Sequence, residues 1–200
     1  MLGTDISENM IELSKAIAKE RNISNIRFER MDAEELDAND NTYDIALCAL
    51  GLMYVPDALQ AIKEMYRVLK PGGYAVAAVW GQRNNCGWAN LFEIVDRRVA
   101  SEVCPMFFNL GNPDSLQSYL TAGGFKDIAT ERLSISLTFS SDEEACGAAF
   151  LGGPVALAYN KFSEEVKKEA EKEYIDSIKQ YKAGNGYLVP GEFVIAIGYK

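Results

Sequence analysis

Strand-like and helix-like segments alternate from one end of this 200-residue chain to the other. Residues 43–50 and 74–80 are almost wholly apolar, which is typical of strands that are buried on both faces of a sheet. Apolar residues recur at helical spacing between such segments, and Ser7, Asp57 and Ser163 stand where helix N-caps are expected. This alternation predicts an α/β fold, in which helices cover a sheet.

The boundaries of these segments follow from caps, turns and periodicity. We expect helices at residues 7–21, 57–70, 88–102, 113–123 and 163–182, and strands at 26–31, 43–50, 74–80, 127–139 and 193–199. In the first helix, Met10, Leu13 and Ile17 share one face. No linker is long enough to divide the chain. The sequence therefore predicts a single domain over residues 1–200, with a helical insert at about 140–162.

Composition excludes several classes of function. The chain has no histidine, which removes Ser-His-Asp and Cys-His triads and histidine metal sites. Its net charge of −9 argues against binding to nucleic acid or to an anionic membrane surface. The four cysteines form no CxxC pair, so no metal site is expected. With no apolar run near the ~20 residues of a membrane span and no visible signal peptide, we expect a cytoplasmic protein.

Three short motifs carry the clearest chemical information. Asp5 stands where a strand passes into a helix, and Asp32 comes just after the next strand. Residues 67–73 (RVLKPGG) read as a helix stop that turns into a strand. A carboxylate at the carboxyl end of a strand can accept hydrogen bonds from both hydroxyls of a ribose. Taken alone, each acid is better explained by a local role, Asp5 at a helix start and Asp32 in a solvated acidic loop, and it is the pair that points to a ligand.

In order and spacing, these motifs resemble those of the class I S-adenosylmethionine (SAM) dependent methyltransferases. Residues 43–57, 79–88, 122–125 and 189–192 also resemble a branch related to the methyltransferase type 11 and quinone-biosynthesis C-methyltransferases. The resemblance covers essentially the whole chain. It implies a Rossmann-like sheet, SAM as the cofactor and a small-molecule substrate as the methyl acceptor.

The resemblance also implies roles for particular residues, although it names no catalytic base. Asp5 would hold the ribose, and Asp32 would accept a hydrogen bond from the adenine amino group. The remaining cofactor contacts are expected from Ile6 on the adenine, Ala33 on a ring nitrogen, and Cys48 and Ala49 on the methionine side. More weakly, the acceptor pocket is expected to include Leu50, Tyr54, Trp80 and Trp88.

Two departures from the family pattern bear on these expectations. The family's glycine-rich turn lies about 20 residues before the first acid, whereas only Met1 and Leu2 precede Gly3. We therefore expect a sheet that lacks the family's first strand and helix, which leaves one edge of residues 43–50 without a neighbour. Three explanations stay open: a truncated record, a homo-oligomer in which a second chain fills the gap by strand exchange, or a closed sheet that no longer binds cofactor.

The second departure is a replacement of polar residues by apolar ones. Where that branch often has glutamines after the fourth strand, this chain has Ala49, Leu50 and Met53, which suits a hydrophobic acceptor or marks a loss of activity. The sequence thus favours methyl transfer from SAM to a small or apolar acceptor. The alternative is a non-catalytic scaffold or oligomerisation module that has lost its cofactor. A nicotinamide-dependent oxidoreductase shares Asp5 but leaves Asp32 unexplained.

Overall fold

The computed structural model describes residues 1–100 and 103–200. The chain divides into two compact units, which are described separately: unit 1 holds Met1–Ala77, Gln117–Ala129 and Ile197–Lys200, and unit 2 holds Ala78–Leu116 and Thr130–Ala196. Whether the chain is one folding domain stays a prediction. The elements in chain order are β1 (Leu2–Asp5), α1 (Glu8–Glu20), β2 (Arg27–Arg30), β3 (Tyr43–Ala49), α2 (Ala58–Val68), β4 (Leu69–Trp80), α3 (Asn90–Asp96), α4 (Ser115–Ala122), β5 (Lys126–Phe139), α5 (Asp142–Phe150), α6 (Ala156–Tyr159), α7 (Glu164–Ile178), β6 (Lys182–Ala183) and β7 (Gly186–Tyr199).

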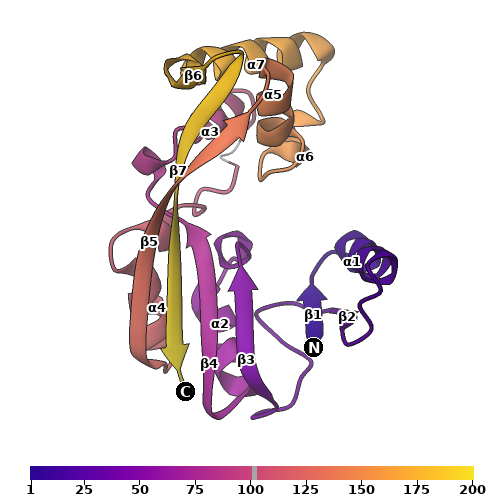
Figure 1. Cartoon of the computed structure of the whole chain (residues 1–200), viewed down its shortest axis with the longest axis vertical. Coiled ribbons are helices and arrows are strands. Elements are labelled where there is room, and N and C mark those ends of the chain that lie inside the picture. The colour runs from indigo at the N-terminus through magenta and orange to yellow at the C-terminus, as the bar shows by residue number, and fades with distance from the viewer. Residues whose placement is uncertain (101–102) are drawn as a thin grey trace. The chain divides into compact units, whose positions relative to one another are not determined.

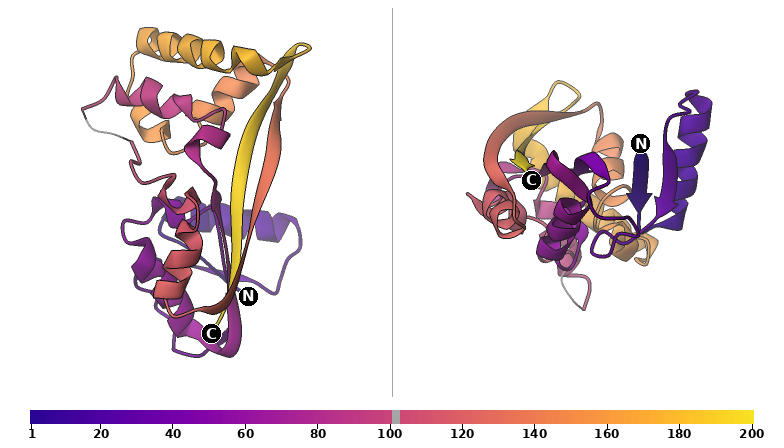
Figure 2. Two further views of the ribbon diagram at one scale, coloured as in Figure 1. Left: turned by 90° about the vertical axis from the view of Figure 1, so that its left-hand side faces the viewer. Right: turned by 90° about the horizontal axis from the view of Figure 1, so that it is seen from below.

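The strands form two separate hydrogen-bonded groups. In unit 1, β1 and β2 pair in parallel, with Asp5 opposite Arg30, and α1 lies beside them (Figure 2). The larger sheet has the order β3-β4-β7-β5, and β6 pairs antiparallel with β7 (Figure 1). Within the described ranges, β3 therefore has β4 on one edge and no strand on the other, as the sequence predicts. The α/β fold is confirmed.

Helix starts lie where the sequence places them. The Ser7 side chain caps α1 by accepting from the Met10 N–H, and Asp57 Oδ1 accepts from the Gln60 N–H at 2.9 Å to cap α2. Ser163 caps α7 in the same way, and Ser141 caps α5 in the region predicted only as a helical insert. These short polar side chains satisfy donors that the first turn of a helix leaves without partners.

Helix ends differ from expectation. Helix α2 stops at Val68 and β4 begins at Leu69, before the Pro-Gly-Gly turn. The N–H groups of Asn41 and Thr42 donate to the carbonyls of Arg67 and Val68 at 3.1 and 2.8 Å. The last carbonyls of α2 are therefore hydrogen-bonded to residues outside the helix. Lys70 also precedes a proline, which disfavours helical backbone there.

Three other predicted boundaries are wrong. Helix α3 spans only Asn90–Asp96, and the last two residues predicted for it lie outside the described part of the chain. Helix α7 ends at Ile178, where a 3₁₀ turn follows. Strand β7 begins at Gly186, because the turn at Gly184 (φ +60°) folds it back against β6 as a hairpin.

Burial in unit 1 is uneven. Helix α2 has a fully buried face that includes Ala61 and Ile62, whereas the α1 face formed by Met10, Leu13 and Ile17 is exposed. Strand β3 was expected to be buried on both faces, but its Ile45 and Leu47 side chains are 51% and 70% exposed. That expectation is wrong because both residues line an open cavity.

Unit 2 has its own apolar core. Its fully buried side chains come from β4, the helices and the segment after α3; they include Val79, Val95, Phe107, Phe150, Tyr174 and Ile178. Helices α5 and α6 lie in the region predicted as a helical insert. Among the described residues, no helix has the length and apolar character that crossing a bilayer requires.

Candidate functional site

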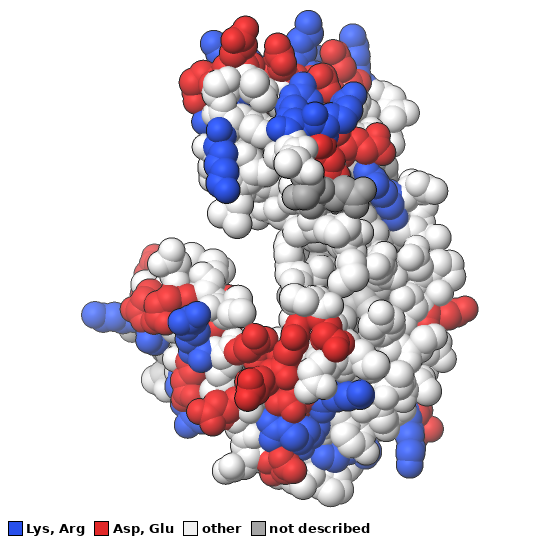
Figure 3. Space-filling view, turned by 180° about the vertical axis from the view of Figure 1, so that it is seen from behind, with Lys and Arg blue, Asp and Glu red and all other residues white. Residues whose placement is uncertain are grey.

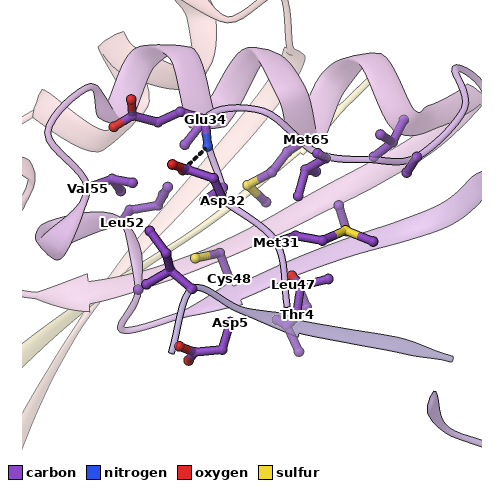
Figure 4. A pocket seen from close by; sticks show the side chains of 18 of the residues that line it. Thr4, Asp5, Met31, Asp32, Glu34, Leu47, Cys48, Leu52, Val55 and Met65 are labelled. Atoms are coloured by element: carbon purple, nitrogen blue, oxygen red, sulfur yellow. Dashed lines mark hydrogen bonds between the residues drawn. The ribbon is translucent and has the colours of Figure 1, made fainter. Parts of the chain in front are cut away.

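Unit 1 contains a cavity of about 690 Å³ where the polypeptide leaves β1, β2 and β3 (Figure 4). Because β1 and β2 are parallel, Asp5 ends its strand opposite Arg30, and Asp32 follows two residues later at the same edge. Ligands of open α/β sheets bind at the carboxyl ends of the strands. The predicted residues that line the cavity are Asp5, Ile6, Asp32, Ala33, Cys48, Ala49, Leu50 and Tyr54.

The Asp5 carboxylate is half-buried and oriented by the backbone. Its Oδ1 atom accepts a hydrogen bond from the Ser7 N–H at 2.8 Å, within the turn that leads into α1. Its Oδ2 atom accepts from no donor among the described residues. One oxygen is thus used to fix the side chain, and the other remains able to accept from a ligand hydroxyl.

Asp32 is held in the same manner. Its Oδ1 atom accepts from the Glu34 N–H at 2.9 Å, the contact drawn in Figure 4. Glu34 in turn connects this loop to the start of α2, because its Oε1 atom accepts from the Asp57 N–H at 2.8 Å and its carbonyl accepts from Gln60 Nε2 at 3.2 Å. The loop that carries Asp32 is therefore attached to the first turn of a helix.

The chain turns sharply after β3 at the edge of the cavity. Leu50 has a left-handed backbone (φ +61°), which is uncommon for a residue with a β-carbon and is strained. A β-carbon at Gly51 would lie 2.9 Å from Cys48 Sγ, so glycine is required for this close approach. Burial raises the pKa of the Cys48 thiol, which keeps it protonated and unreactive at neutral pH.

The charge of the cavity has one sign. Its ionised lining groups are the carboxylates of Asp5, Asp32 and Glu34, and the described residues that line it include no Lys or Arg. Figure 3 shows acidic side chains grouped on one face of the surface. Phosphate groups are usually bound by Arg, Lys or helix N-termini, so this lining suits a neutral or cationic ligand better than a pyrophosphate.

A pair on α2 supports the loop from outside the cavity. Arg67 donates to both oxygens of Glu64, each at 2.7 Å, and to the carbonyls of Ala38 and Leu36 at 2.7 and 2.9 Å. The hydrogen bonds from Arg67 hold the pKa of the buried Glu64 carboxyl below its usual value. These supporting roles of Glu64 and Arg67 and the linking role of Glu34 are not evident from the sequence, because the loop partners lie 23 to 31 residues away in the chain.

The predicted acceptor residues fall into both units. Leu50 and Tyr54 line the cavity of unit 1. Trp80 and Trp88 belong to unit 2, where their rings contact each other with centroids 4.7 Å apart.

Comparison with known proteins agrees with this arrangement. Residues 1–77 match the methyltransferase domain family. A demethylmenaquinone methyltransferase of Listeria welshimeri is 39% identical over 97 residues, which cover 48% of this chain and 41% of that protein. The chain thus spans about two fifths of the length of that curated relative.

Solved structures show the same fold over the full length. A Bacillus halodurans protein has a TM-score of 0.66 at 19% identity, covering 100% of this chain and 82% of that one. A Haemonchus contortus phosphoethanolamine N-methyltransferase in complex with S-adenosyl-L-methionine has a TM-score of 0.59 at 18% identity, covering 100% and 43%. Residues 1–77 are thus similar in sequence to the methyltransferase domain family, and the whole chain shares the fold of these solved structures.

Proposed function

We propose that this protein transfers a methyl group from SAM to a small, apolar acceptor. The observation that carries the proposal is the convergence of Asp5 and Asp32 on one cavity, each with one carboxylate oxygen bonded to backbone and the other available. A nucleoside offers matching donors, the ribose hydroxyls and the adenine amino group.

The side chains that line the cavity fit SAM better than they fit a dinucleotide. Asp5 would accept from the ribose, and Asp32 would accept from the adenine amino group. Ile6, which is 60% exposed at the cavity, would cover the base. A carboxylate-lined site suits the positive charge of a sulfonium, whereas a pyrophosphate finds no basic side chain among the described lining residues.

The remaining lining suits an apolar acceptor. Leu47, Leu52, Val55 and Met65 contribute apolar side chains to the same cavity. When bound, SAM supplies an activated methyl group, so the chain's own task is to align the reactants and exclude water. The likeness to a demethylmenaquinone methyltransferase supports an acceptor of this kind. We further propose that the protein works in a reducing cytoplasm, which agrees with its four free cysteines.

Calorimetry with S-adenosylhomocysteine and SAM tests cofactor binding. We expect binding by the 200-residue chain, and a loss of about tenfold or more in affinity for Asp5→Asn and for Asp32→Asn, because each removes a charged acceptor. Glu35→Gln is the matched control, since Glu35 is an exposed neighbouring acid outside the cavity lining. NADH should not compete.

Two results would reject the proposal. Absence of binding by the wild-type chain would favour the alternative, a methyltransferase fold that serves as a scaffold. Equal affinity of both Asp variants and the wild type would remove these side chains from the site. For the acceptor, methyl-labelled SAM should deliver label to compounds that partition into organic solvent; label confined to polar products would reject an apolar acceptor.

A further inference from the structure

Unit 2 contains a second cavity, which is lined by residues of α5, α6 and α7 and has a volume of about 560 Å³. These three helices lie together in unit 2 (Figure 1). The cavity shares no lining residue with the cavity of unit 1. It is therefore separate from the site of the proposed methyl transfer, and a ligand bound in it would be a different molecule.

Three charged side chains of α7 line this second cavity. Lys168, Lys172 and Asp176 recur every four residues, so they lie along one stripe of the helix. In the described part of the chain, none of the three makes a hydrogen bond or an ion pair. By contrast, Lys167 on the same helix pairs with Glu164 at 2.8 Å. The charges along this stripe are thus available to a ligand.

The opposite charges of the stripe are separated along the helix axis. At a rise of ~1.5 Å per residue, Asp176 is displaced about 12 Å along α7 from Lys168 and about 6 Å from Lys172. The end of the stripe near the C-terminus of α7 is therefore acidic, and the end towards its N-terminus is basic.

A carboxylate from α5 adds to the acidic end. Asp142 lines the cavity and accepts from the Tyr187 hydroxyl at 2.6 Å. Tyr187 pairs with Lys182 in the hairpin that follows α7, so Asp142 lies near the C-terminus of that helix. The hydrogen bond with Asp142 and the negative charge of Asp176 both raise the pKa of the Tyr187 hydroxyl, which agrees with two carboxylates at this end.

Less polar residues also line the cavity. α7 contributes Ile175, and Leu151 follows the end of α5. Gly147 of α5 leaves open space, because a β-carbon added there would meet no atom within 4 Å. The Glu171 carboxylate also lines the cavity, but its Oε1 atom already accepts from the Tyr159 hydroxyl at 2.5 Å. This part of the lining suits a chain of methylene groups.

We propose that the second cavity binds an elongated zwitterion of the ω-amino carboxylate class, with its ammonium group at Asp142 and Asp176 and its carboxylate at Lys168. Each charged end then meets groups of opposite sign, and the methylene chain between them covers apolar lining. An α-amino acid carries its two charges on neighbouring atoms and is too short to reach both ends. Among the described residues, no group of acids and cysteines could hold a metal ion, so a cation alone fits less well.

Three probes separate the contributions of the two ends: 6-aminohexanoate, hexylamine and hexanoate, with no SAM or S-adenosylhomocysteine present. We expect 6-aminohexanoate to bind the 200-residue chain about threefold to fivefold more tightly than either other probe, as one additional exposed charge pair warrants. In a ¹⁵N NMR titration the shifted amides should lie within residues 142–176. Salt at about 1 M should weaken binding, since it screens exposed charges.

Substitutions at the two ends should affect different probes. We expect Asp176→Asn to weaken hexylamine and leave hexanoate unchanged, and Lys168→Gln to weaken hexanoate and leave hexylamine unchanged. Both should weaken 6-aminohexanoate about threefold. The two residues are exposed, so these changes should not affect folding. Lys179→Gln is the matched control, because Lys179 is an exposed lysine outside the cavity lining.

A variant that fills the cavity gives an independent test. Gly147→Leu extends into open space, and leucine favours a helix more than glycine does, so this variant should fold and lose binding. The proposal is overturned if 6-aminohexanoate binds the wild type no more tightly than both single-charge probes, or if Gly147→Leu binds it as well as the wild type. Neither outcome bears on SAM binding in unit 1.

Discussion

Arg67 connects α2 to the loop that carries Asp32. Its guanidinium makes five hydrogen bonds at 2.7 to 2.9 Å, to Glu64, Asp40 and the carbonyls of Leu36 and Ala38. Removing it would leave the buried Glu64 carboxylate without its cation and two carbonyls without donors. The position of Asp32 thus depends on a residue that does not line the cavity.

We expect Arg67→Gln to lower the free energy of unfolding by about 2 kcal/mol, a value reduced by the partial exposure of the side chain. It should also weaken binding of S-adenosylhomocysteine. Lys70→Gln is the control, since it removes the same charge from an exposed pair with Asp44 and should leave stability unchanged. Urea denaturation measures both variants, and equal effects would contradict this role of Arg67.

Glu64 gives the stability a defined pH dependence. Its folded pKa lies below the usual 4.5, mainly because Arg67 donates to it, so the carboxylate favours folding above the unfolded pKa. That contribution is lost as the pH falls from about 4.5 through the lower, folded value. In urea denaturation between pH 7 and pH 3.5, Glu64→Gln should lose less stability than the wild type. An identical pH profile for both proteins would show that Glu64 does not contribute.

At the scale of elements, sequence patterns predicted where helices and strands lie, but not which of their faces are buried. The caps at Ser7 and Asp57 depend on residues three positions away, so they were predicted correctly. The apolar pattern of β3 indicated a buried strand, yet Ile45 and Leu47 are exposed because they line an open cavity. Burial depends on partners from distant parts of the chain, and periodicity carries no information about whether those partners are present.

The same limit decides which residues of the candidate site could be predicted from the sequence. Asp5 and Asp32 were identifiable because each lies at or just after the end of a strand, and parallel pairing then brings the strand ends together. The roles of Glu34 and Arg67 were not, because Glu34 has no local motif, Arg67 was read only as part of a helix stop, and their contacts form only when the loop folds onto α2. Roles that depend on long-range contacts cannot be predicted from a single sequence.

Helix α1 offers a matched test of its burial. Ile11 is 2% exposed, whereas Ile17 on the same helix is 39% exposed. Ile11→Ala should therefore cost about 2–4 kcal/mol of unfolding free energy, and Ile17→Ala less than about 1 kcal/mol, because it removes little buried surface. Chemical denaturation compares the two, and a larger loss for Ile17→Ala would show that its face of the helix is the covered one.

At the scale of the molecule, three long strands belong to both units. β4, β5 and β7 each begin in one unit and end in the other. Each is a single continuous element, so the loss of one part is expected to disrupt the strand as a whole. The chain should therefore unfold in one cooperative transition.

Two spectroscopic signals test this cooperativity. Both tryptophans lie in unit 2, so their fluorescence reports on that unit, while far-UV circular dichroism reports on helices of both. We expect the two signals to give the same midpoint, and Ile11→Ala in unit 1 to lower the fluorescence midpoint as well. Separate midpoints, or a fluorescence midpoint that ignores Ile11→Ala, would show that the units unfold independently.

The left-handed backbone at Leu50 affects how readily this cavity can change during evolution. Any residue with a β-carbon bears a similar conformational penalty there, apart from asparagine and aspartate, which tolerate it better, and the β-branched residues, which tolerate it worse. Exchanging leucine for another side chain that is not branched at Cβ thus leaves this backbone penalty nearly unchanged while it reshapes the rim of the cavity. Position 50 is therefore a place where mutation can alter ligand preference with little loss of stability.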